Sequence, residues 1–281
     1  MSHTVSTQGA QIATTAQKAE WTTARRALVI AGAAIIAATW LYFVLVHPAD
    51  WDQVTGSGAG IALLAGYGIG TALLLAAVIP VLPARTLGLI PIAIIINSVV
   101  GEIVGSIGLP LYLDSVGTVL VAALAGPVAG MATGALNNVV WGLLNPAALP
   151  FAAGAALVGW LAGMFIHRFN AFRNIGTVIG FGIVLGIVGG MVAAPVAAYV
   201  YGGTAGVGTG ALVSLFREMG GSLIASVTTQ AFISDPVDKV IVMLVAYFTV
   251  KALPNRTVAA FAPKTANQAN AAKATAPTTA A

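Results

Sequence analysis

Apolar runs long enough to cross a lipid bilayer recur along most of this chain. The first covers residues 27–46 and the second residues 59–82, and neither contains a charged side chain. A helix needs about 20 consecutive apolar residues to span the hydrocarbon core of a bilayer. Charged residues make up only 7% of the chain, whereas soluble domains contain about 25%. The sequence therefore predicts an all-α, polytopic integral membrane bundle that contacts lipid.

Further apolar segments follow in order at residues 87–106, 115–126, 128–144, 148–166, 175–201 and 236–253. Residues 115–126 would form only about 18 Å of helix. They must therefore tilt, extend beyond these limits, or form a hairpin with residues 128–144 that turns at Gly126-Pro127. Pro236 suits the first turn of a helix, which predicts that the last span begins there. Residues 211–233 are expected to form a helix that lies at the outer interface or dips into the bundle; a full span, which would place the C-terminus outside, is the less favoured alternative.

The placement of charge indicates an orientation. If both termini face the cytoplasm, every Lys and Arg except Arg217 and Lys239 falls on the inner side, as basic residues of membrane proteins usually do. Glu20 is then the only acidic residue on that side. The sequence thus predicts a multi-pass protein of the cell membrane with cytoplasmic ends. The polar tails 1–24 and 255–281 are expected to be disordered.

No catalytic motif stands out in the sequence. The chain has no cysteine, and it contains no GxSxG, HExxH or phosphate-binding GxxxxGK pattern. These absences disfavour an enzyme, and we expect no metal or other cofactor. Any ATP-driven activity would then need a partner protein. The basic residues are scattered, so nucleic acid binding is not expected.

A group of polar and aromatic residues is expected on the outer side of the bundle. A few polar groups and an aromatic ring among apolar helices suit a pocket for a small molecule. The candidate substrate-binding residues are Tyr112, Asp114, Asn137, Asn138, Trp141, Arg217, Glu218 and Gln230. Among them, Asp114 lies between hydrophobic segments, where an unpaired carboxylate is costly.

Structural roles stay open for several polar residues. Tyr112 and Trp141 are also consistent with aromatic residues at the membrane interface, and Arg217 with a solvated ion pair to its neighbour. Asn145, which precedes a proline, is typical of a turn. Asp235, which also precedes a proline, is typical of an N-terminal helix cap.

Small or polar residues recur at every fourth position of the segment 87–106. They are Ala93, Asn97, Gly101 and Gly105. Such a stripe lets another helix approach closely. It predicts either packing inside the chain or contact with a partner helix, and Asn97 is also suited to a hydrogen bond between helices.

Four sequence blocks, in the same order, resemble a known membrane protein family. They are Ile90-Pro91-Ile92-Ala93 leading to Asn97, LPLYLDSVGT at residues 109–118, LAGPVAG at residues 124–130, and ISDPVDK at residues 233–239 followed by VKALP at residues 250–254. These blocks resemble the substrate-binding S components of energy-coupling factor (ECF) transporters. The similarity covers residues 87–256.

The resemblance implies a six-helix membrane domain, here residues 86–254, preceded by two extra spans within residues 25–85. Proteins of this family capture a vitamin or related micronutrient from the outer side, and they work with a transmembrane T subunit and two ATPases. The family's pocket maps onto the candidate residues named above, in the first outer loop and in the region 217–235. The substrate stays open, because Asp114 and Glu218 favour an amine whereas Arg217 favours a carboxylate or phosphate.

The chain departs from the family pattern in two respects. The first helix of the family commonly meets the T subunit through an alanine-x-x-x-alanine stripe, but here Ala93 is followed four residues later by Asn97. The two extra spans have no counterpart in the six-helix pattern. The alternative function is a membrane sensor or assembly factor that uses the same bundle without transport.

Overall fold

The computed structural model describes residues 21–46, 57–203 and 206–263. The α-helices in these ranges are α2 (Thr23–Val46), α4 (Gly58–Val78), α5 (Ala84–Ser106), α6 (Val116–Ala125), α7 (Pro127–Leu144), α8 (Ala152–His167), α9 (Ile175–Tyr201), α10 (Val207–Glu218), α11 (Leu223–Ala252) and α12 (Asn255–Phe261). Three short 3-10 helices join them: η1 (Ile79–Val81), η2 (Pro146–Phe151) and η3 (Ala171–Arg173). The described residues contain no strand, and the predicted all-α class is confirmed.

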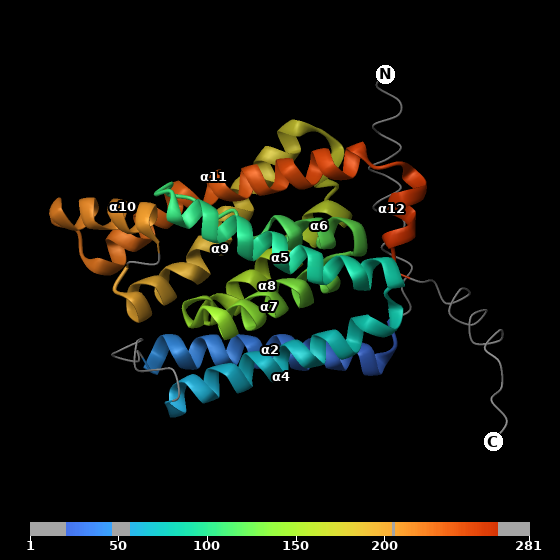
Figure 1. The fold of residues 1–281 in the computed structure, drawn as a ribbon, viewed down its shortest axis with the longest axis horizontal. Helices are drawn as coiled ribbons and strands as arrows, with labels where there is room; N and C mark the ends of the chain where they lie inside the picture. The colour runs from blue at the N-terminus through green and yellow to red at the C-terminus, as the bar shows by residue number, and fades with distance from the viewer. Residues whose placement is uncertain (1–20, 47–56, 204–205, 264–281) are drawn as a thin grey trace.

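The bundle is built around the short helix α6. Helix α6 contacts α5, α7, α8 and α11, and its residues after Val116 are buried except Leu120. Helices α2 and α4 pair along one side and pack on the rest of the bundle through α4 and α7 (Figure 1). Helix α10 lies at one end and α12 at the other (Figure 1). The N-terminal pair is therefore an added layer on one side of the core.

Five segments of the described chain are long and apolar enough to cross a membrane. They are Thr23–Leu45, Gly58–Val81, Ala84–Ser106, Pro146–His167 and Ile175–Tyr199. On α5, large aliphatic side chains such as Ile92, Ile95 and Ile103 are more than half exposed. A helix that faced water would carry polar residues on that side. These helices are compatible with a multi-pass membrane protein.

The short apolar segment forms a hairpin with its successor, one of the three arrangements predicted for it. Helix α6 ends at Gly126, whose φ of 93° favours glycine. Pro127 then occupies the first turn of α7, where its missing N–H costs nothing. The two helices pack against each other across this turn.

The expectation of one continuous helix over residues 211–233 is wrong. Helix α10 ends at Glu218, and Gly220 adopts a φ of 91°. The side chain of Ser222 then accepts a hydrogen bond from the backbone N–H of Ala225 at the start of α11. A glycine with positive φ and a serine cap are the ordinary signals that end one helix and begin the next. The Gly220-Gly221-Ser222 sequence carried this information.

The last span does not begin at Pro236 either. Helix α11 starts thirteen residues earlier and continues through this proline. A proline inside a helix removes one backbone hydrogen bond and favours a break. Here tight packing opposes the break, because the Cα of Pro236 would lie 2.4 Å from a Cβ added to Gly186 of α9. Tertiary packing has overridden a local preference.

The predicted disordered tails lie largely outside the described residues, but both predicted boundaries need correction. The N-terminal helix already begins at Thr23. Residues 255–261 form α12, and the hydroxyl of Thr86 donates a hydrogen bond of 2.6 Å to the backbone oxygen of Phe261. The start of the C-terminal tail is therefore held against α5.

Close approach of α9 and α11 depends on a stripe of glycines on α9. A Cβ added to Gly182 would lie 2.8 Å from the Cα of Val240, and one added to Gly190 would lie 2.8 Å from the Asp235 carboxylate. Real Cβ atoms do not approach other atoms this closely. Small residues of this kind let membrane helices pack backbone to backbone.

We expect Gly186→Ala to lower the melting temperature of the purified protein in detergent. The new Cβ would lie 2.4 Å from the backbone oxygen of Asp235, and overpacking of this kind costs about 1–3 kcal/mol. Gly180→Ala in the same helix is the control, because nothing lies within 4 Å of its added Cβ. Equal melting temperatures for the two variants would contradict the close contact of α9 with α11.

Candidate functional site

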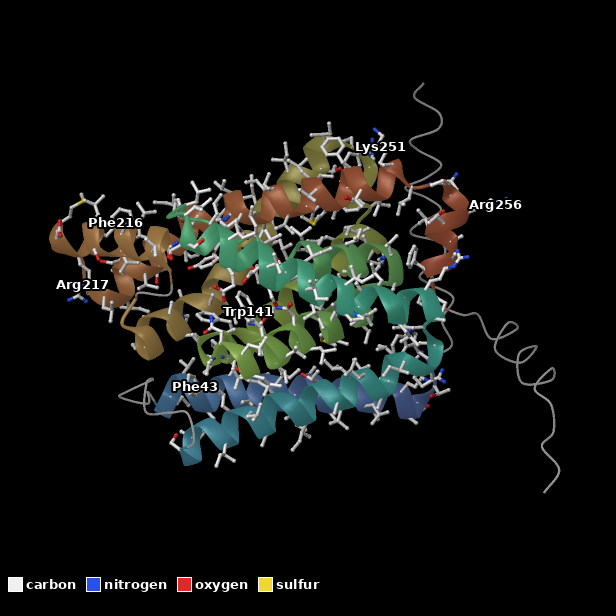
Figure 2. All side chains as sticks on the ribbon, in the orientation of Figure 1. Phe43, Trp141, Phe216, Arg217, Lys251 and Arg256 are labelled. Carbon is white, nitrogen blue, oxygen red and sulfur yellow. The ribbon has the colours of Figure 1, made fainter. Side chains whose placement is uncertain are left out.

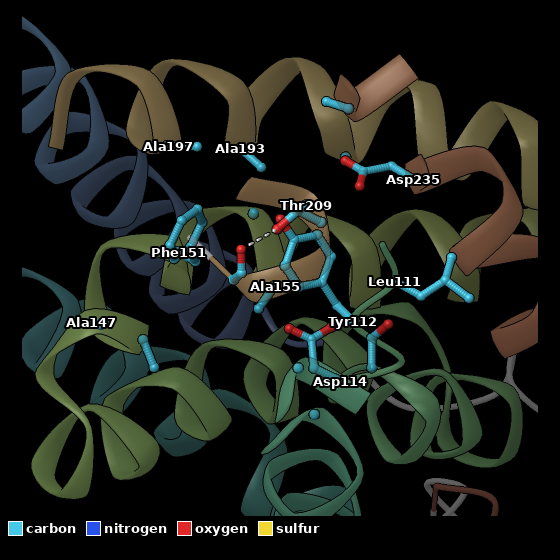
Figure 3. Close-up of a pocket in the computed structure, with 18 of the residues that line it drawn as sticks. Leu111, Tyr112, Asp114, Ala147, Phe151, Ala155, Ala193, Ala197, Thr209 and Asp235 are labelled. Atoms are coloured by element: carbon cyan, nitrogen blue, oxygen red, sulfur yellow. Dashed lines mark hydrogen bonds between the residues drawn. The ribbon is translucent and has the colours of Figure 1, made fainter. Parts of the chain in front are cut away.

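A cavity of about 410 Å³ lies within the bundle (Figure 3). Its walls come from α5, the α5–α6 loop (residues 107–115), α7, η2, α8, α9, the start of α10, and α11. Helix α9 contributes only small residues: Gly189, Ala193, Ala194 and Ala197. The volume lies within the range of about 300–1,000 Å³ that is usual for small-molecule pockets.

One buried carboxylate fixes the α5–α6 loop against α11. Asp238 is fully buried, and its Oδ1 accepts hydrogen bonds from the backbone N–H groups of Tyr112 at 2.9 Å and Leu113 at 2.7 Å. Leu113 has a φ of 50°, a conformation that is unusual for leucine and persists where surrounding contacts enforce it. The loop geometry at the cavity thus depends on a residue 125 positions further along the chain.

Lys239 links α11 to the α5–α6 loop by ion pairs. Its ammonium contacts Oδ2 of the neighbouring Asp238 and lies 3.7 Å from Oδ1 of Asp114 in the loop. Buried charges are tolerated when they are paired in this way. Asp114 lines the cavity and is half-buried, so it is neither isolated in an apolar environment nor fully hydrated.

Two aromatic residues, Tyr112 and Phe151, line this part of the cavity. Figure 3 shows the side chain of Tyr112 close to Thr209 at the start of α10, whose hydroxyl donates a hydrogen bond of 3.4 Å to the backbone oxygen of Gly206. Burial and then the nearby Asp235 carboxylate raise the pKa of the Tyr112 hydroxyl in the loop above its ordinary value. The hydroxyl therefore stays protonated and available for hydrogen bonding.

Trp141 belongs to a polar cluster at the exposed rim of the cavity. Its Nε1 donates a hydrogen bond of 3.1 Å to Oε1 of Glu102, and Nδ2 of Asn145 donates another to the same oxygen. Asn145 also accepts from the backbone N–H of Ala147, which fits the predicted turn. The cluster ties α7 to α5.

Three cavity-lining polar groups lack partners within the described part of the chain. The Nε2 of Gln230 and the Oγ of Ser115 are buried without a hydrogen bond. The carboxylate of Asp235 is 8% exposed, and it makes no hydrogen bond there and no ion pair with Lys239 within 4 Å. Unpaired polar groups in such surroundings are costly, so these three groups are candidates for contact with a ligand.

The two predicted asparagines have different positions. Asn138 lines the cavity, and its Nδ2 donates a hydrogen bond of 2.8 Å to the backbone oxygen of Ala148 in η2. Asn137 does not line the cavity; it is buried and donates to Oδ1 of Asn138. Asn138 therefore fixes η2 against α7 at the cavity wall. Asn137 orients the side chain of Asn138 by donating a hydrogen bond to it.

Arg217 and Glu218 do not belong to the site, which corrects the sequence-based prediction. Both are exposed, and Figure 2 shows Arg217 on α10 at the left end of the molecule. Only the start of α10 reaches the cavity, through Val207, Gly208 and Thr209. An α-helix rises 1.5 Å per residue, so Arg217 lies about 12 Å further along the axis than Thr209.

The stripe on α5 faces inward, so the predicted partner contact through it also needs correction. Ala93 packs against Gly117 of α6, and Gly101 packs against Trp141 and Asp114. Asn97 is fully buried; it accepts from the N–H of Gly117 and donates to Oγ1 of Thr118. Gly105 lines the cavity. Internal packing, the alternative interpretation, accounts for Ala93, Asn97 and Gly101, whereas nothing lies within 4 Å of a Cβ added to Gly105.

Sequence reasoning found only part of the polar face of α11: the predicted pocket region ended at Asp235, and Asp238 and Lys239 were not among the candidates. Asp235, Asp238 and Lys239 are spaced i, i+3 and i+4, so they share one side of a helix. Charged residues at that spacing within an apolar helix mark a functional site. The signal was present but was obscured, because Pro236 was interpreted as a helix start and Asp235 as its cap. Thr209 and Phe151 carried no comparable signal.

Within the described residues, no three His, Asp or Glu side chains are grouped so that they could hold a metal ion.

Comparison with protein-family models, curated proteins and solved structures finds no match. The geometry of the cavity and the sequence blocks are therefore the observations that bear on function.

We expect Asp238→Ala to free the α5–α6 loop. Hydrogen exchange at the amides of Tyr112 and Leu113 should accelerate about tenfold or more, because a hydrogen bond to a charged group contributes about 1.5–3 kcal/mol. Glu218→Ala is the control, since it removes an exposed carboxylate of α10. Unchanged exchange at both amides, measured by mass spectrometry on the folded variant, would show that Asp238 does not hold the loop.

Proposed function

We propose that this chain is the substrate-capture subunit of an ATP-driven importer of the ECF type, embedded in the cell membrane. The observation that carries the proposal is the cavity, which has small-residue walls, a few aromatic residues and unpartnered polar groups. Pockets that bind small molecules are built in this way. The expected substrate is a vitamin or related micronutrient.

The sequence blocks that resemble S components support the proposal because two of them meet at this cavity. The block at residues 109–118 supplies the α5–α6 loop, and the block at residues 233–239 supplies the polar face of α11. They are joined directly where Asp238 accepts from Tyr112 and Leu113. Residues that are distant in the sequence thus form one site.

The remaining parts of the importer are proposed as separate subunits. The chain contains no phosphate-binding GxxxxGK pattern, so ATP hydrolysis is assigned to two partner ATPases and coupling to a transmembrane T subunit. Contact with the T subunit is assigned to a face other than the one that carries Ala93, Asn97 and Gly101, since these three residues pack inside the chain. We keep both termini on the cytoplasmic side, as charge placement indicates.

Trp141→Ala is expected to weaken binding of the retained small molecule about tenfold or more, because aromatic contacts in a pocket contribute strongly to binding. The melting temperature is measured alongside, because the variant also removes the structural contacts of Trp141 with Glu102 and Gly101. The molecule is first identified by mass spectrometry after gentle purification. Trp160→Ala is the matched control, since Trp160 of α8 is 36% exposed and does not line the cavity. Equal affinity of both variants would place binding elsewhere.

Uptake experiments test the importer itself. Deletion of the gene should abolish uptake of the identified molecule, and the tagged protein should co-purify with a membrane subunit and ATPases. A protein that binds its ligand normally but whose deletion leaves uptake unchanged would instead be a sensor or assembly factor. A protein that retains no small molecule at all would overturn the capture function.

A further inference from the structure

The charges that line the cavity are unequal in number. Three carboxylates, those of Glu102, Asp114 and Asp235, face one ammonium, that of Lys239, which gives a formal charge of −2. The ammonium of Lys239 is already matched by Asp114 and by Asp238. An anionic ligand would therefore find no unmatched cation among the cavity-lining residues that the structure describes.

Asp235 is the group most in need of a counter-ion. Its side chain projects from α11 toward the part of the cavity where Thr209 and Tyr112 lie (Figure 3), and its Oδ2 would contact a Cβ added to Gly190. The absence of a side chain at Gly190 makes room for the carboxylate beside α9. A buried carboxylate is costly unless it is paired, and the described residues provide no hydrogen bond or ion pair within 4 Å for Asp235.

The neighbouring walls suit the body of an organic cation. Tyr112, Trp141 and Phe151 each line the cavity, and aromatic faces attract cations as well as apolar groups. Nearby, the unpartnered Nε2 of Gln230 and Oγ of Ser115 can hydrogen-bond polar substituents. A bare divalent ion fits less well, because no cluster of three acidic or histidine side chains surrounds the position within the described residues.

We propose that the cavity binds an organic cation, with its positively charged nitrogen at Asp235 and its apolar or aromatic body against Tyr112, Phe151 and Trp141. This inference rests on the proposed capture function and narrows its substrate class. It also resolves the choice left by the sequence, since the arginine that favoured a carboxylate or phosphate lies outside the cavity.

Three probes with the same indole ring test the charge preference on the full-length protein in detergent. They are tryptamine, which carries an ammonium group, tryptophol, which is neutral, and indole-3-propionate, which carries a carboxylate. Calorimetry at neutral pH should give tryptamine a Kd about tenfold or more below those of the other two, because only tryptamine forms a charge-assisted contact. This comparison needs no variant, so it holds even where a substitution impairs folding.

Asp235→Asn keeps the side-chain shape and removes the charge. It should weaken tryptamine binding about tenfold or more and change tryptophol binding less than about twofold, since only the former contains a cation. Glu218→Gln is the control, because it removes an exposed carboxylate outside the cavity. Loss of tryptamine affinity in both variants alike, or in neither, would overturn the role of Asp235.

The outcomes separate this inference from the proposed function. Binding of tryptophol or indole-3-propionate as tightly as tryptamine would overturn the organic cation while leaving a capture protein. If none of the probes binds, the charge of the small molecule retained on purification decides: a cation supports the inference, and a neutral or anionic molecule overturns it. No binding of any probe together with no retained molecule would overturn both proposals.

Discussion

The buried carboxylate of Asp238 holds together the parts that form the cavity. It accepts two backbone N–H groups of the α5–α6 loop and pairs with Lys239 beside it. A fully buried charge cannot be left unpaired in apolar surroundings, so the loop and α11 are constrained to meet. Through Asp114, the same network positions a carboxylate on the cavity wall. The same network of Asp238, Lys239 and Asp114 therefore fixes the loop that shapes the cavity and holds one of the carboxylates on its wall.

Small residues have two opposite uses in this bundle. Where Gly182 and Gly186 of α9 face α11, the missing side chains bring the helices into backbone contact. Gly189, Ala193 and Ala197 of the same helix line the cavity. Their small side chains leave the space unfilled. A membrane bundle has little hydrophobic driving force between its helices, so close packing supplies much of its stability. The glycine-rich sequence thus provides both the close contacts between helices and the cavity.

The accuracy of sequence-based prediction depended on whether the signal was local. The α6–α7 turn followed from Gly126-Pro127, and the limits of α9, residues 175–201, matched the apolar run. The helix break at Gly220 was also a local signal but was outweighed by hydrophobic length. Helix α11 was misjudged, because Pro236 breaks an isolated helix but is tolerated against the glycines of α9. No local rule includes that neighbour.

The sequence by itself determined the all-α class and located the five apolar helices that are long enough to cross a bilayer, because the length of an apolar run fixes how much helix can cross. It also indicated that Tyr112, Asp114 and Trp141 were candidates for a pocket. Only the tertiary structure decided that Asp235 joins them and that Arg217 does not. The reason is geometric: the direction of a side chain depends on the rotation and position of its whole helix, and these are set by packing between residues far apart in the chain.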